Sequence, residues 1–148
     1  MALKIVVGGL VVSNGKLVLV QEGKPGIRGL WNLSLGGLEE NEGILDGAKR
    51  EIMEETGFKV ELEKLIGVYQ NPVRNNGKDN VVKFIFLAKI LSGELKKPSD
   101  LLEVKWVSFH ELLSMPDEKM RDESIKLAAR DYLAGKSFST DLIAVYKK

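Results

Sequence analysis

Runs of apolar and β-branched residues, separated by short polar breaks, dominate the first part and the middle of the chain. Residues 5–12 and 16–20 are two such runs, with Asn14-Gly15 between them. Because Asn-Gly favours the positive backbone angles of a two-residue turn, this spacing predicts a β-hairpin. Further extended segments are expected over residues 30–35, 59–69, 81–90 and 103–107.

Elsewhere the hydrophobic period changes to that of a helix. Residues 43–56 carry an apolar stripe, and Gly57 follows as a typical helix end. Residues 122–133 form a second helical pattern, and Ser108 with Glu111 has the spacing of a capping box, which predicts a helix start. This order of elements predicts an α/β (α+β) fold with a mixed sheet, not a doubly wound parallel sheet.

Length and composition narrow the class of protein. The 148 residues fit one domain, residues 1–148, and a net charge of +1 argues against a dedicated nucleic-acid binder. The absence of cysteine excludes a disulfide scaffold and a thiolate metal site, and a single histidine, His110, excludes a multi-histidine site. Because the sequence has no membrane-length apolar stretch and no recognisable signal peptide, we expect a cytoplasmic protein that does not bind membranes.

One helical stretch is unusually acidic beside its apolar stripe. Glu51 and Glu55 are four residues apart, so their carboxylates lie one above the other on one helix face. Repulsion and partial burial both make this pair costly, and a divalent cation such as Mg²⁺, which often shares its ligands with substrate phosphates, would relieve the cost. The alternative is an ordinary solvated acidic face.

The surrounding residues carry a resemblance to a known family. Gly36 is followed after five residues by Glu42, and after seven more by the run Arg50-Glu51-Ile52-Met53-Glu54-Glu55-Thr56-Gly57-Phe58. Residues 36–58 thus resemble the Nudix box of the MutT/Nudix hydrolases. The resemblance implies an α/β/α sandwich that hydrolyses a diphosphate linkage with Mg²⁺, for which Mn²⁺ can substitute.

The resemblance also assigns roles to individual positions. It implies that Arg50 orients a neighbouring glutamate, that Glu42 supports the loop by hydrogen bonding, and that Asn41 takes a positive backbone angle. Gly36 and Gly37 would let the backbone approach the diphosphate. The metal ligands implied are Glu51, Glu55, Glu54, the backbone carbonyl of Leu35 and, in addition, Glu39. The candidate general bases are Glu54 and Glu103, with Glu94 and Asp100 as weaker candidates.

Four residues outside the box are candidates for substrate binding. Trp31 could stack on a base or fill the core. Arg28, Arg74 and Lys83 could bind phosphate or be solvated cations.

Several functions stay open on the sequence. Nucleoside di- and triphosphates or a related organic pyrophosphate are the expected substrates, and a looser similarity to phosphatase-type Nudix enzymes favours them. ADP-ribose or a nucleotide sugar is the alternative substrate. A Nudix-fold binding module without catalysis and an acidic protein-binding helix are the alternatives to an enzyme. The chain could be a monomer or a homodimer.

Overall fold

The structure, a computed structural model, describes residues 3–72 and 80–147. Its strands are β1 (Leu3–Ser13), β2 (Lys16–Glu22), β3 (Trp31–Asn32), β4 (Ser34–Gly37), β5 (Phe58–Asn71), β6 (Asn80–Gly93) and β7 (Leu101–Ser108). Its helices are α1 (Ile44–Thr56), α2 (Phe109–Ser114), α3 (Ser124–Leu133) and the short 3-10 helices η1 (Asp117–Lys119) and η2 (Thr140–Leu142).

The strands form a mixed sheet in the order β3-β2-β1-β6-β5, with β4 paired to β1 and β7 paired to β2. Strand β1 joins the two halves of this sheet. It runs parallel to β6, with Leu3 opposite Asn80 and Val11 opposite Ala88, and antiparallel to β4 and β2. The predicted mixed sheet is therefore confirmed.

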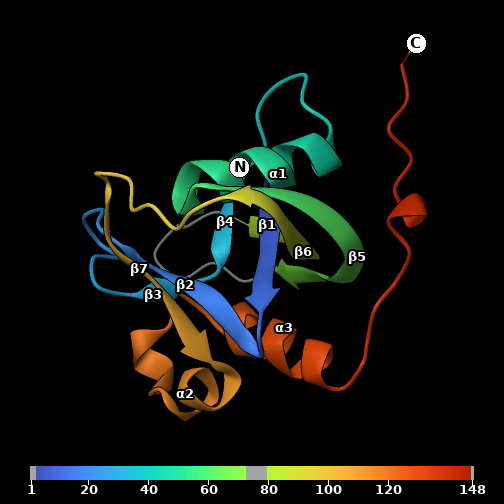
Figure 1. The fold of residues 1–148 in the computed structure, drawn as a ribbon. Coiled ribbons are helices and arrows are strands. Elements are labelled where there is room, and N and C mark those ends of the chain that lie inside the picture. The colour runs from blue at the N-terminus through green and yellow to red at the C-terminus, as the bar shows by residue number, and fades with distance from the viewer. Residues whose placement is uncertain (1–2, 73–79, 148) are drawn as a thin grey trace.

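Helices cover both faces of the sheet, with α1 on one face and α2 and α3 on the other (Figure 1). Alternate residues of β1 point to the two sides. Val7 and Val11 pack with Ala48 and Ile52 of α1, whereas Val6 and Leu10 pack in a second core with Ile125, Ala128 and Ala129 of α3. Each face is thus closed by the apolar stripe of a helix.

The local turn and cap predictions are confirmed. Asn14 and Gly15 have φ angles of 52° and 74° in the β1–β2 turn, and Asn41 before α1 has φ 61°. Gly57 ends α1 in the left-handed conformation with φ 84°. At the start of α2, Ser108 and Glu111 form the expected reciprocal capping box. None of the helices in the described part of the chain is long and apolar enough to pass through a bilayer.

Candidate active site

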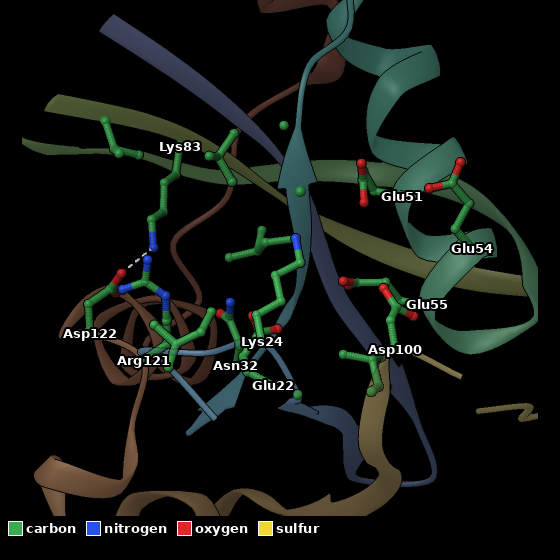
Figure 2. A pocket seen from close by; sticks show the side chains of 18 of the residues that line it. Glu22, Lys24, Asn32, Glu51, Glu54, Glu55, Lys83, Asp100, Arg121 and Asp122 are labelled. Atoms are coloured by element: carbon green, nitrogen blue, oxygen red, sulfur yellow. Dashed lines mark hydrogen bonds and ion pairs between the residues drawn. The ribbon is translucent and has the colours of Figure 1, made fainter. Parts of the chain in front are cut away.

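A cavity of about 890 Å³ opens between α1, β4 and the ends of β2 and β6. Its acidic lining residues are Glu22, Glu51, Glu54, Glu55, Asp100 and Asp122, and its basic ones are Lys4, Lys24, Lys83 and Arg121. Figure 2 shows that β4 runs between two groups of these side chains, with Glu51, Glu54 and Glu55 on one side and Lys83, Arg121 and Asp122 on the other. The cavity therefore has an acidic half and a more basic half.

The carboxylates of α1 project into the acidic half because of their helical spacing. Glu51 and Glu55 lie one turn apart, and Glu54 lies beside them. The Oε1 atom of Glu55 is buried and has no hydrogen-bond partner in residues 3–72 and 80–147. Burial raises the pKa of Glu55 well above its ordinary value, and the charges of Glu51 and Glu22 raise this pKa further. The pKa of Glu51 is also raised, first by burial.

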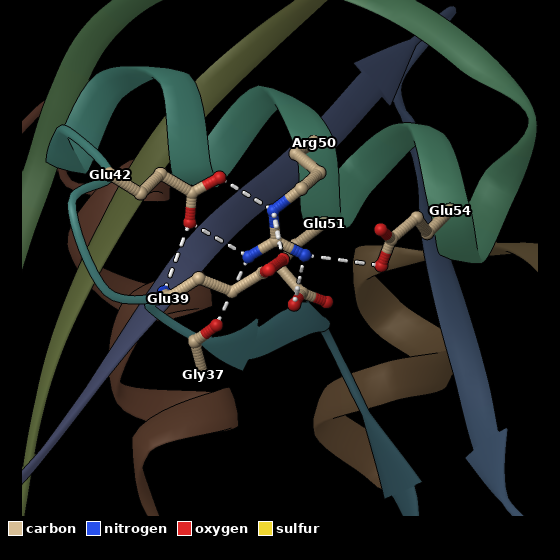
Figure 3. Close-up of polar contacts among 6 residues, drawn as sticks. All are labelled: Gly37, Glu39, Glu42, Arg50, Glu51 and Glu54. Atoms are coloured by element: carbon tan, nitrogen blue, oxygen red, sulfur yellow. Dashed lines mark hydrogen bonds and ion pairs between the residues drawn. The ribbon is translucent and has the colours of Figure 1, made fainter.

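Arg50 holds the box together through a set of polar contacts (Figure 3). Its guanidinium donates to both carboxylate oxygens of Glu42 at 2.6 and 2.9 Å, to Glu51 at 2.8 Å and to the Gly37 carbonyl at 3.1 Å. It also donates to the exposed Glu54 at 3.2 Å. The hydrogen bonds from Arg50 lower the pKa of Glu42, so Glu42 is held ionised. Arg50 thus contacts Glu51 and Glu54 from the side of the loop that precedes α1.

Glu42 links this arginine to the loop before α1. Besides its bonds to Arg50, its Oε1 accepts a hydrogen bond from the backbone N–H of Glu39 at 3.1 Å. The Glu39 carboxylate also lies 3.0 Å from Arg50, is largely exposed, and is absent from the residues that line the cavity. The structure therefore places Glu42 in the supporting role that the resemblance implies. Glu39, a predicted metal ligand, lies outside the cavity instead.

Gly36 lets a carboxylate lie against the backbone of β4. A Cβ atom at this position would come within 2.0 Å of the Glu51 carboxylate, so only glycine leaves room for Glu51 in this orientation. Gly37 and Leu35 also line the cavity. Carboxylate side chains and the backbone of β4 thus line the same part of the cavity, and carboxylate and carbonyl oxygens are the ligands that a hard divalent cation prefers.

The donor set fits a magnesium-type ion that keeps much of its water shell. Among residues 3–72 and 80–147, no three histidine, cysteine or carboxylate side chains cluster closely enough to hold a metal. Magnesium, however, is commonly held by one or two carboxylates, with water and substrate oxygens completing its shell. The unpaired buried oxygen of Glu55, with Glu51 beside it, is consistent with that mode.

Two sequence candidates, Trp31 and Glu103, lie on the other face of the sheet from α1. On β2, Gln21 lies between Trp31 of β3 and Glu103 of β7. The preceding residue, Val20, lies between Asn32 of β3 and Val104 of β7. Directly opposed residues share a face, so Glu103 and Trp31 lie together, and Asn32 lies on the face toward α1. Trp31 is 8% exposed in the α3-side core, and Lys105 Nζ lies 4.7 Å from its ring centroid. Neither Trp31 nor Glu103 lines the cavity, whereas the weaker candidate Asp100 does.

The cationic candidates divide in the same way. Arg28 is exposed, donates to the Gly23 carbonyl at 3.2 Å and does not line the cavity. Arg74 lies outside the described residues. Lys83 does line the cavity, and its ammonium contacts Asp122 at 2.5 Å and Ser124 at 2.9 Å. Of the three proposed phosphate ligands, the structure therefore brings Lys83 to the site.

Sequence reasoning missed several lining residues, notably Glu22, Lys24, Asn32 and Arg121. Alternation along β2 does not mark Glu22, because residues of both parities, from Leu17 to Val20, are fully buried. Burial raises the pKa of Glu22, although Arg121 counteracts this effect. No local pattern marks Arg121, which reaches the cavity only through tertiary packing.

The sequence of the chain is similar to those of known proteins. A family model described as "NUDIX domain" matches residues 2–130. The chain is 29% identical over 133 residues to an ADP-ribose pyrophosphatase of Methanocaldococcus jannaschii, covering 90% of this chain and 75% of that one. It is 28% identical over 141 residues to phosphatase NudJ of Escherichia coli, covering 94% and 89%. Several other curated relatives are longer, and the chain spans between 31% and 62% of their lengths.

A solved structure is similar over nearly the whole chain. A NUDIX hydrolase from Nitrosomonas europaea superposes with a TM-score of 0.88, at 26% identity, and the match covers 98% of each chain.

Proposed function

Because the chain belongs to the NUDIX domain family, we propose that it is a metal-dependent hydrolase of small diphosphate compounds. Nucleoside di- and triphosphates, or a related organic pyrophosphate, are the first candidate substrates. The similarity to phosphatase NudJ supports this choice, while the similarity to an ADP-ribose pyrophosphatase supports ADP-ribose as the second. A cavity of about 890 Å³ is large enough for a nucleotide.

The observation that carries this proposal is the buried Oε1 of Glu55, which has no hydrogen-bond partner in the described part of the chain and lies beside a second carboxylate. Burying an unsatisfied charged oxygen costs free energy, and structures retain such groups mainly where a ligand completes them. Glu55 and Glu51 would hold the ion, with the Leu35 carbonyl and Glu54 as further ligands. Mg²⁺ is the ion proposed, with Mn²⁺ as a substitute. When bound, it would neutralise diphosphate oxygens and lower the pKa of a water molecule.

The chain's own residues would position the reaction and move the proton. Gly36 and Gly37 carry no side chains of their own, so the diphosphate would approach the backbone of β4 beside the Glu51 carboxylate, which lies against Gly36. Arg50 keeps Glu51 and Glu54 oriented through hydrogen bonds of 2.8 and 3.2 Å. Glu54 on α1, or Asp100 in the turn just before β7, would accept the proton of the attacking water, since both residues line the cavity. Glu103 is set aside as a base because it does not line the cavity.

Phosphate and pyrophosphate release provides the test. Nucleotides, ADP-ribose and thiamin-pyrimidine pyrophosphate would be incubated with Mg²⁺, with Mn²⁺ and with EDTA. We expect release that requires metal and falls by a factor of about a thousand or more in Glu55→Gln, as removal of a main electrostatic group often does. Glu63→Gln, an exposed glutamate on β5, is the matched control and should keep full activity.

Two results would contradict the proposal. Release that continues in EDTA, or that is unchanged in Glu55→Gln, would refute the metal role of Glu55. Absence of release with every compound, together with thermal stabilisation by nucleotides, would favour the binding-module alternative.

A further inference from the structure

The more basic half of the cavity has no role in the hydrolysis described above. Lys4, Lys83 and Arg121 line it. In the parallel β1–β6 ladder, Lys83 of β6 lies opposite Val6 of β1. Lys4 lies two residues before Val6 on β1 and therefore points to the same side of the sheet. Both lysines thus lie on the α3 face. Glu51, Glu54 and Glu55 lie across β4 from Lys83 and Arg121 (Figure 2).

Lys83 already has a charged partner. Its ammonium contacts Asp122, and Asp122 in turn accepts hydrogen bonds from the Ser124 N–H at 2.9 Å and the Ser124 hydroxyl at 2.5 Å. The side chain of Lys83 is only 10% exposed, so this pair is a fixed part of the wall. The positive charge of Lys83 is therefore largely matched by Asp122.

Arg121 differs, because its side chain has no such partner among the residues that the structure describes. Within residues 3–72 and 80–147, no hydrogen bond or ion pair involves the Arg121 guanidinium. Its backbone, by contrast, is held firmly. The Arg121 N–H donates to the Trp31 carbonyl at 2.8 Å, Met120 forms a β-bridge with Trp31, and Asp122 is bonded to the start of α3. A guanidinium on a fixed backbone, unpaired and directed at a cavity, is preorganised for a ligand.

The charges of this half favour an anionic ligand over a neutral ring. Lys4, Lys83 and Arg121 outnumber the acidic residues that face them, which are Asp122 and, at the border with the acidic half, Glu22. A neutral heterocycle would require donors and acceptors but no excess of positive charge. Arginine's planar fork matches the oxygens of a phosphate group in a bidentate manner.

We propose that Arg121, with the Lys83–Asp122 pair behind it, forms an anion subsite, and that the preferred substrate carries a second phosphate group outside the hydrolysed diphosphate. This inference rests on the proposed function, because it assigns the hydrolysed diphosphate to the carboxylate side of β4. It identifies the substrate class as diphosphate compounds that are anionic at both ends.

The first test measures phosphate binding without turnover. Inorganic phosphate would be titrated into the protein in EDTA, because the unneutralised carboxylates then repel anions from the other half of the cavity. We expect binding to weaken by about tenfold or more in Arg121→Gln, the typical effect of losing a charged hydrogen bond. Arg130→Gln, an exposed arginine on α3, removes the same charge elsewhere and should bind phosphate as the wild type does. Equal binding by Arg121→Gln, or no binding by the wild type, would overturn the subsite.

The second test compares turnover of two substrates that differ by one phosphate. The ratio of kcat/KM for adenosine 3′-phosphate 5′-diphosphate over that for ADP should exceed one and fall about tenfold in Arg121→Gln. An unchanged ratio would overturn the proposed substrate class. The two failures are distinguishable. Metal-dependent turnover without Arg121-dependent phosphate binding refutes the subsite alone, and Arg121-dependent binding without turnover refutes the hydrolase alone.

Discussion

Replacing Arg50 with lysine keeps a positive charge in the box but removes the planar fork that reaches several acceptors at once. The guanidinium contacts Glu42 twice, Glu51 once and the Gly37 carbonyl once, all within 3.1 Å. A lysine ammonium is a single point on a flexible stem. It can satisfy one carboxylate well, so at least two of these hydrogen bonds would be lost in Arg50→Lys.

The size of the loss follows from burial. The side chains of Glu42 and Glu51 are 16% and 12% exposed, so water replaces the arginine only in part. The bond to Glu54 adds little, because that side chain is 56% exposed. At roughly 1–2 kcal/mol for each lost bond after allowance for solvent, Arg50→Lys should lower the free energy of unfolding by about 2–4 kcal/mol.

Urea unfolding followed by tryptophan fluorescence measures this change, because Trp31 is buried in the native core. The protein would be kept in EDTA so that metal affinity does not contribute. Arg130→Lys, the same substitution at an exposed arginine, should change stability by less than about 0.5 kcal/mol. A loss below about 1 kcal/mol in Arg50→Lys, with an unchanged denaturant slope, would refute the view that this network supports the loop.

Three further predictions concern other parts of the molecule. The pKa of Glu55 is raised in the folded protein, so the folded state binds this proton more tightly than the unfolded state, in which the pKa of the carboxyl is near 4.5. Metal-free protein should therefore lose stability as the pH rises above about 4.5 and through the folded-state pKa. Urea titrations in EDTA should show this slope, Glu55→Gln should flatten it, and an equal slope in both proteins would contradict the assignment. Gly36→Ala should displace the Glu51 carboxylate, because the added methyl group would occupy its place. Calorimetry should then show Mg²⁺ binding weakened by about tenfold or more, as expected for the loss of one ligand. Unchanged affinity would exclude Glu51 as a ligand. Ser108→Ala removes the hydroxyl that caps α2 by accepting from the Glu111 N–H at 3.0 Å. It should lower the free energy of unfolding in urea by about 1 kcal/mol without changing turnover, and a loss of turnover would contradict this purely structural role.

Local signals in the sequence were sufficient for much of the fold. The hairpin at Asn14-Gly15 and the end of α1 at Gly57 depend on backbone angles that few residues adopt, so the residue type alone indicates them. The shift from strand to helix periodicity likewise located α1. The division of residues 30–37 into β3 and β4, which pair with different strands, was not visible, because both segments are too short for a period to emerge.

The candidate site was only partly accessible to the same reasoning. Glu51, Glu54 and Glu55 share a helix, so their proximity follows from helical geometry. Whether Trp31 and Glu103 lie on the α1 face or on the α3 face of the sheet depends on strand pairing between distant segments, which the local sequence does not show. Arg121 is held at the cavity by a backbone hydrogen bond to the Trp31 carbonyl, and no local sequence pattern predicts this contact.

The parallel pairing of β1 with β6 has a consequence for synthesis on the ribosome. The two strands are separated by most of the first half of the chain, from Leu3 to Asn80. At about 5–20 residues per second, β1 emerges several seconds before its central partner exists. During that interval it can pair only with β2 and β4, so its β6 edge is open to water and to other nascent chains. Such non-local parallel pairing also makes folding intrinsically slow, and the exposed β1 edge is where we expect a chaperone to be needed.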